Sequence, residues 1–107
     1  MEQYLYRVQP TRTEMLSEGP TEDEAAIVQA HFEYLQRLTR DGIVLMAART
    51  LTTDSDSFGI VIFEADSVDA ARSLMNGDPA VHEGVMSAEL FPCRVALWSD
   101  SGPGGIA

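Results

Sequence analysis

Residues 43–63, IVLMAARTLTTDSDSFGIVIF, decide the fold of this chain. Two apolar segments, at 43–51 and 58–64, flank a polar turn at 52–57, and this pattern predicts two strands that pair as an antiparallel hairpin. A strand with one wet face alternates apolar and polar residues, but both segments place apolar or small side chains on both faces. The sequence therefore predicts a sheet that is covered on both sides.

A long helix is expected just before this hairpin. Thr21 and Glu24 have the spacing of a capping box, and the acidic residues after Thr21 suit the positive end of a helix dipole. Gly42 is a typical helix stop. Between these signals the apolar residues recur at helical spacing, and His31 lies in the middle of their stripe. We therefore expect His31 to face the core.

The remaining segments complete a β-α-β-β-α-β order. We expect a strand at 3–9, a polar loop at 11–20, a helix from Asp66 or Ser67 to about Asn76, a short turn starting at Asp78 and Pro79, and a last strand region at 85–98 that is bent or placed at an edge by Pro92. This order is the ferredoxin-like plan, an α+β fold with an antiparallel sheet and two helices on one face. A second copy of the chain is the simplest cover for the other face, so we predict a homodimer. The alternative is a monomer with a few exposed apolar residues.

Length and charge bound the function. The chain has 107 residues, which suits one domain; we place it at 1–98, followed by a flexible tail at 99–107. The net charge of −10 opposes binding to nucleic acid or to an anionic membrane, because both need clustered Lys or Arg. No apolar run is long enough to cross a bilayer and no signal-type stretch starts the chain, so we expect a cytoplasmic protein.

His31 and Asp78 are the candidate catalytic residues. A titratable ring in an apolar stripe needs a partner, and the segment NGDPAV at 76–81 presents a carboxylate just before a proline. An aspartate that accepts from one ring nitrogen fixes the tautomer and leaves the other nitrogen to take up a proton. Such a pair performs general acid/base chemistry on small organic molecules without a cofactor. The alternative is a histidine hydrogen-bonded within the core and an Asp78 that only caps a helix.

Other polar side chains have simpler interpretations than a role in the site. The capping box is sufficient to explain Glu24, and Tyr34 is interpreted as a core residue with its hydroxyl in water. Arg49 and Arg94 could hold a substrate carboxylate, but single arginines more often form surface ion pairs.

His82 and Cys93 complete the set of candidates. His82 and Asp78 have an i,i+4 spacing that, together with His31, imitates a metal site, but we expect His82 on an exposed turn and no metal. Cys93 is the single cysteine, so no internal disulfide can form, and we interpret it as a small buried thiol without a catalytic role.

Four segments resemble a known family in their order and spacing. They are HFEYL at 31–35 followed by Gly42, SVDAAR at 67–72, DPAV at 78–81 with Gly84, and FPCRVAL at 91–97. Together they make the chain similar to the YciI-like (YCII-related) proteins. The resemblance implies a dimeric α+β barrel related to muconolactone isomerases and small barrel monooxygenases. It also implies an active site formed by a His-Asp pair, here His31 and Asp78.

Two functions are open at this stage. The resemblance implies an enzyme that performs isomerisation, lactone or elimination chemistry on a small organic acid or aromatic compound, with no cofactor. The alternative is a non-catalytic dimer that binds a small ligand or serves as an accessory module, with a structural histidine. A cavity beside His31 would favour a site, and tightly packed surroundings would favour the structural role.

Overall fold

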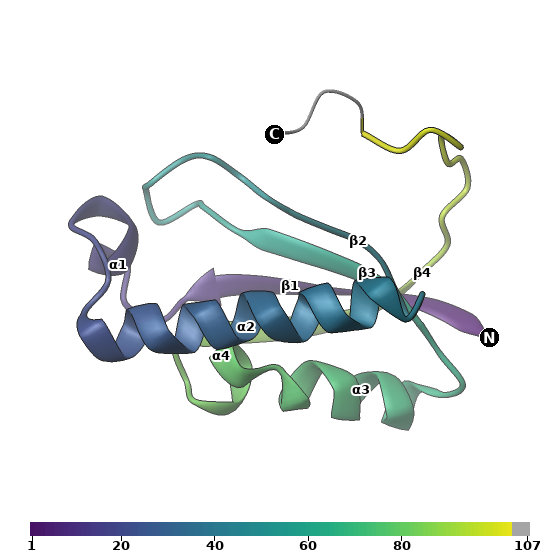
Figure 1. The fold of residues 1–107 in the computed structure, drawn as a ribbon, viewed down its shortest axis with the longest axis horizontal. Coiled ribbons are helices and arrows are strands. Elements are labelled where there is room, and N and C mark those ends of the chain that lie inside the picture. Colours follow the sequence, from purple (N-terminus) through teal and green to yellow (C-terminus); the bar gives the residue numbers. More distant parts are fainter. Residues whose placement is uncertain (104–107) are drawn as a thin grey trace.

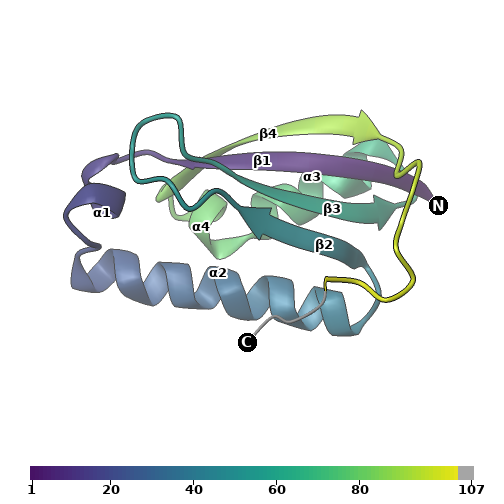
Figure 2. The same cartoon turned by 90° about the horizontal axis from the view of Figure 1, so that it is seen from above.

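The computed structural model describes residues 1–103, and its elements follow the predicted order. They are β1 (Glu2–Pro10), α1 (Glu14–Ser17), α2 (Glu22–Arg40), β2 (Val44–Arg49), β3 (Gly59–Ala65), α3 (Val68–Gly77), α4 (Pro79–His82) and β4 (Met86–Cys93). Within the described residues the strands form one antiparallel sheet with the order β2-β3-β1-β4, which Figure 2 shows from above. The α+β fold with ferredoxin-like order is thereby confirmed, and β2 and β3 form the predicted hairpin.

The core lies between the sheet and the helices α2 and α3, which cover the same face (Figure 1). Along the central strands every second side chain points into this layer and is buried, because the side chains of a strand alternate between the two faces. The buried members of the core cluster are Tyr4, Tyr6, Val8, Leu35, Val44, Val61, Phe63, Ala65, Ala71 and Met75. Phe63 is a fully buried member of this cluster, and the ring of Tyr6 lies edge-on to the ring of Phe63 at a centroid distance of 5.7 Å.

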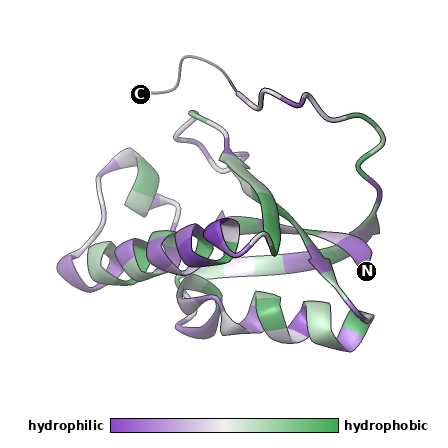
Figure 3. Cartoon of the chain, turned by 45° about the vertical axis from the view of Figure 1, so that its right-hand side comes forward, coloured by the Kyte–Doolittle hydropathy of each residue, from purple (hydrophilic) through white to green (hydrophobic). Residues whose placement is uncertain are grey.

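The opposite face of the sheet carries a group of apolar side chains next to charged ones, among them the ion pair of Arg7 and Glu89. Cross-strand partners share a face, and the register therefore places on this side Leu5, Met46, Ala48, Ile60, Ile62 and Phe91, which we call the outer face. Each of these side chains is only partly buried or exposed. No helix among the described residues covers them, and the hydrophobic colouring of the hairpin strands is visible in Figure 3. The prediction of apolar side chains on both faces is thus confirmed.

Two predicted strand ends and one predicted loop differ from the structure. β4 ends at Cys93 instead of 98, because its pairing with β1 stops at Gln3, and beyond Cys93 the Val95 N–H donates to the side chain of Gln3 instead of to a strand backbone. The hairpin strand β2 ends at Arg49 instead of 51. The expected loop at 11–20 contains the short helix α1, which buries Met15. The edge position of Pro92 is as predicted, since β4 is an outer strand of the sheet.

The first residues of the predicted tail, 99–103, are described by the structure. Ser99 and Gly102 are joined by a backbone hydrogen bond of 3.0 Å, and most of residues 99–103 are exposed. The rest of the predicted tail, 104–107, lies outside the described residues, so its flexibility stays a prediction. Over residues 1–103, none of the helices combines the length and the apolar character needed to cross a bilayer.

Candidate active site

His31 is placed by α2, and the start of this helix is built as predicted. The Thr21 hydroxyl accepts from the Glu24 N–H, and the Glu24 carboxylate accepts from the Thr21 N–H, so the capping box is complete. Gly42 follows the helix with a φ of 77°, a left-handed conformation that suits glycine. In the middle of the helix the His31 side chain is 14% exposed, one turn before the buried Leu35.

Asp78 lies at the junction of α3 and α4. Its N–H donates to the carbonyl of Met75 at the end of α3, and its Oδ1 accepts from the N–H of Ala80 at 3.0 Å, which caps α4. Pro79 occupies the first position of α4, where its fixed φ suits a helix and its missing N–H costs nothing. The capping role expected for Asp78 is confirmed, and it fixes the orientation of a carboxylate that is fully buried.

The structure brings the two predicted site residues together. His31 Nδ1 lies 2.7 Å from Oδ1 and 2.8 Å from Oδ2 of Asp78. Tyr6 of β1, which the sequence did not single out, donates its hydroxyl to Oδ2 of Asp78 at 2.7 Å. A buried carboxylate needs such donors, because its loss of hydration is otherwise uncompensated. Asp78 therefore caps a helix and binds His31 at the same time.

This geometry defines what the ring can do. An ionised carboxylate only accepts hydrogen bonds, so in the neutral ring the proton lies on Nδ1 of His31. Nε2 then has a free lone pair, and within residues 1–103 it makes no hydrogen bond. Nε2 is the ring nitrogen that can take a proton from a bound molecule and return it.

A pocket of about 320 Å³ lies beside His31, between α2 and the end of the sheet near the β2–β3 turn. This volume is within the range of small-molecule sites. Its apolar lining includes Leu16 of α1, Phe32 and Leu35 of α2, Phe58 before β3, and Met86 of β4. Its polar lining, apart from His31, includes Arg49, Thr50, Thr52 and Ser57. The sequence had indicated only Arg49 of this lining, as a residue that could hold a substrate carboxylate, and the other lining residues besides His31 were missed.

The secondary candidates lie mostly outside this pocket. Tyr34 donates its hydroxyl to the carbonyl of Leu74 at 2.7 Å instead of reaching water, and burial raises the pKa of Tyr34. Arg49 lines the pocket, whereas Arg94 does not. His82 has a side chain 73% exposed and contacts Glu83, as expected for an exposed turn.

Two further expectations concern sulfur and metal ligands. Cys93 is partly exposed, so the expectation of a buried thiol is wrong, although partial burial raises the pKa of Cys93. Among residues 1–103, His, Cys, Asp and Glu side chains form no group of three or more that could hold a metal ion.

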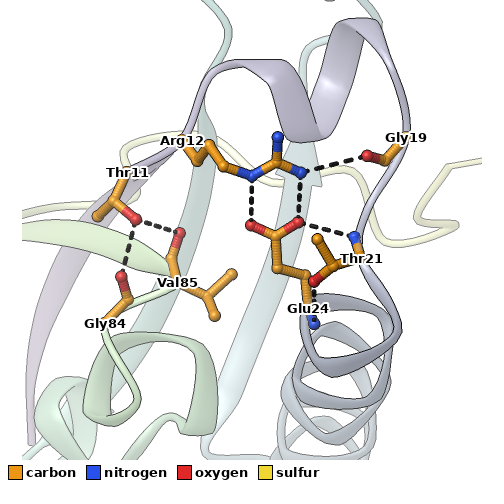
Figure 4. A network of polar contacts seen from close by, with 7 residues as sticks. All are labelled: Thr11, Arg12, Gly19, Thr21, Glu24, Gly84 and Val85. Atoms are coloured by element: carbon orange, nitrogen blue, oxygen red, sulfur yellow. Dashed lines mark hydrogen bonds and ion pairs between the residues drawn. The ribbon is translucent and has the colours of Figure 1, made fainter.

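Hydrogen bonds connect the segment before α2 to the first turn of α2 and to the turn before β4 (Figure 4). Arg12 donates from Nε and Nη2 to the two carboxylate oxygens of Glu24, at 2.9 and 2.6 Å. The hydroxyl of Thr11 donates to the carbonyl of Gly84 at 2.8 Å. These contacts hold the segment that carries α1, so that Leu16 forms part of the pocket wall.

The Arg12–Glu24 contact predicts a pH-dependent contribution to stability. Arg12, and then the backbone N–H of Thr21, lower the pKa of Glu24 to about 2. A carboxyl group whose pKa is lowered on folding stabilises the folded state above its unfolded pKa, and this contribution disappears as the pH falls through the folded pKa. We therefore expect Glu24→Gln to lower the thermal midpoint at neutral pH. The difference from the wild type should vanish as the pH falls from about 5 to about 2.

Thermal denaturation at a series of pH values measures this effect. Glu22→Gln is the matched control, because Glu22 is an exposed acid in the same first turn and interacts with the same helix dipole. An equal decrease in both variants would attribute the effect to the dipole and contradict a specific role of Arg12.

Comparisons with known proteins agree with this architecture. The family model described as the YCII-related domain matches residues 4–94. No curated protein matches the chain significantly. Among solved structures, the chain is similar to 5-chloro-2-hydroxyhydroquinone dehydrochlorinase (TftG) from Burkholderia phenoliruptrix AC1100, solved in complex with 2,5-dihydroxybenzoquinone. The TM-score is 0.61 at 19% identity, over 85% of this chain and 93% of that one, and at this identity the likeness concerns the fold alone. The family match spans most of the chain, including His31 and Asp78, and the chain therefore belongs to the YCII-related domain family.

Proposed function

We propose that this protein is a small-molecule enzyme in which His31 transfers protons as general acid and base and Asp78 orients it. The observation that carries this proposal is the hydrogen bond from Nδ1 to a fully buried carboxylate, with a pocket beside the ring. A histidine with a purely structural role needs no cavity beside it. The pocket therefore favours a site over simple core packing.

The reaction class that this pair supports is proton transfer: isomerisation, lactone chemistry or elimination. Nε2 takes a proton from an acidic hydroxyl or from a carbon next to a carbonyl. In an isomerisation, the same proton returns to another atom of the substrate. In an elimination, the leaving group departs as an anion and the proton passes to solvent. A positioned acid/base of this kind contributes about 10²- to 10⁴-fold to the rate.

The substrate class that we propose is a small organic acid or aromatic compound. Phe32 and Phe58 give the pocket aromatic walls, and Arg49 supplies a cation. In a chain with a net charge of −10, a guanidinium beside an apolar pocket is suited to a carboxylate or a phenolate. The similar dehydrochlorinase fold, with a dihydroxybenzoquinone bound, is consistent with a single-ring substrate.

The protein is further proposed to act as a homodimer in the cytoplasm, with a single domain at 1–98 followed by a C-terminal tail. The two copies pair through the outer face and form the dimeric α+β barrel that the family resemblance implies. Support comes from the apolar side chains of the outer face, among them Phe91 with 42% exposure. A second chain packed on this face removes them from water.

The test is a screen of chlorinated hydroquinones and phenols, lactones and muconates against the wild type and His31→Ala. Turnover by the wild type, followed by ultraviolet absorbance and chloride release, with none above background in the variant, is the expected result. Equal turnover by both proteins would remove His31 from the mechanism. Saturable binding of ring compounds without turnover in the whole screen would favour the second candidate, a ligand-binding dimer with a structural histidine, which the same pocket supports.

A further inference from the structure

Tyr6 links the core of the sheet to the candidate site. Its side chain is fully buried, and its ring packs edge-on against Phe63. Its hydroxyl donates to Oδ2 of Asp78 at 2.7 Å. Tyr6 does not line the pocket beside His31. Among residues 1–103, its hydrogen bond to Asp78 is its direct polar connection to the site.

The hydroxyl of Tyr6 acts as a permanent donor. Burial, and then the charge of Asp78, raise the pKa of Tyr6, so the phenol keeps its proton at physiological pH. Asp78 thus accepts three hydrogen bonds, from the Tyr6 hydroxyl, the Ala80 N–H and the His31 ring. The carboxylate is shared between the imidazole and two donors that do not take part in any proton transfer.

We propose that Tyr6 is a positioning residue that fixes Asp78 and limits how strongly this carboxylate attracts the Nδ1 proton of His31. The inference rests on the proposed function of the His31–Asp78 pair. A carboxylate that already accepts from a phenol and a backbone amide offers less negative charge to the imidazole. The hydrogen bond from Nδ1 is then weaker, and the protonated ring returns its proton to the substrate or to solvent more easily than it would beside a carboxylate without these donors.

The other titratable and charged groups around His31 allow Tyr6 to be tested alone. Asp78 approaches from the start of α4, Arg49 lies on the pocket wall in β2, and Tyr34 lies one turn further along α2. Tyr34 donates to a backbone carbonyl, and Arg49 makes no ion pair within residues 1–103. Removing the hydroxyl of Tyr6 therefore changes one donor to the carboxylate and leaves these groups in place.

Tyr6→Phe removes the hydroxyl and keeps the ring. We expect the Nδ1–H proton resonance of His31, observed by NMR in protein labelled with ¹⁵N-histidine, to move downfield, because the hydrogen bond to Asp78 becomes stronger. We also expect kcat to fall about 10-fold or more at unchanged KM, since Tyr6 does not touch the pocket. The chain has two histidines, and the exposed ring of His82 exchanges its protons with water, so the resonance can be assigned to His31.

Tyr4→Phe is the matched control. Tyr4 lies two residues earlier on the same face of β1 and packs on the same Phe63, but its hydroxyl donates to Glu2 at 2.6 Å. It should leave the His31 resonance and kcat unchanged. Site-specific 3-fluorotyrosine at position 6 is the complementary change, because the more acidic phenol is a stronger donor. It should move the His31 resonance upfield, and it provides the test if Tyr6→Phe does not fold.

The resonance is measured without substrate, so the test is independent of the screen with His31→Ala. A downfield shift in Tyr6→Phe that is absent in Tyr4→Phe supports the positioning role, even if no substrate is turned over. An unchanged resonance in folded Tyr6→Phe, or a raised KM with unchanged kcat, would overturn it. The proposed function fails on a different observation, equal turnover by the wild type and His31→Ala.

Discussion

Asp78→Asn is expected to lower kcat by about 10²- to 10⁴-fold while the protein stays folded. Asparagine has nearly the same shape, and its carbonyl oxygen can still accept from the Ala80 N–H, so α4 remains capped. Its amide nitrogen, however, is a donor that faces Nδ1 of His31. The ring then carries its proton on Nε2 and offers the pocket an N–H where the mechanism needs a lone pair.

Steady-state kinetics on the substrate found in the screen measures this loss, and the ¹⁵N chemical shifts of His31 report the tautomer directly. Asp69→Asn is the control, because Asp69 is an exposed acid in the first turn of α3 and should leave kcat unchanged. A folded Asp78→Asn protein with full activity would show that the carboxylate does not orient the base.

Ile62→Asp is expected to convert the proposed dimer into monomers. Ile62 lies in the middle of the outer face, opposite Leu5 on β1 and Met46 on β2. A two-fold interface contains each residue twice, and an unpaired buried charge costs several kcal/mol. We expect the dimer to dissociate about 10³-fold more readily at least. The isolated chain should still fold, because Ile62 is only partly buried within it.

Sedimentation or light scattering distinguishes the monomer of 11.7 kDa from a dimer of twice that mass. Gln36→Asp adds the same charge at an exposed position of α2, on the helix-covered side of the sheet, and should leave the dimer intact. A wild-type protein that is monomeric at micromolar concentration would contradict the proposed pairing.

The sequence predicted the fold best where the signal is local. The capping box of Thr21 and the cap and proline at Asp78 and Pro79 define helix starts through neighbouring residues, and both were correct. The end of β4 was wrong because it depends on where the pairing with β1 stops, at Gln3, almost a whole chain length away. α1 was missed because its four residues have little helical signal of their own and depend on contacts such as the burial of Met15.

The candidate site was predictable in part for the same reason. His31 and Asp78 are each unusual for their local sequence. His31 is a titratable ring in an apolar stripe, and Asp78 is an acid directly before a proline, so each is expected to have a hydrogen-bond partner. Tyr6 has no such local signal, because Tyr4 and Tyr6 share one face of β1. Only the position of Asp78 in the folded chain decides which of the two hydroxyls reaches it. The pocket walls come from several distant segments, so no single stretch of sequence could define them.

Asp78 ends α3 and starts α4, so the length of α3 determines where the carboxylate that binds His31 lies. One inserted residue advances an α-helix by about 1.5 Å and rotates the next segment of the chain by about 100°. The ten residues of α3 therefore set how far the carboxylate stands from the strand and from the imidazole. Insertions in the turn between β2 and β3 change the shape of the pocket, whereas an insertion in α3 separates the acid from its base.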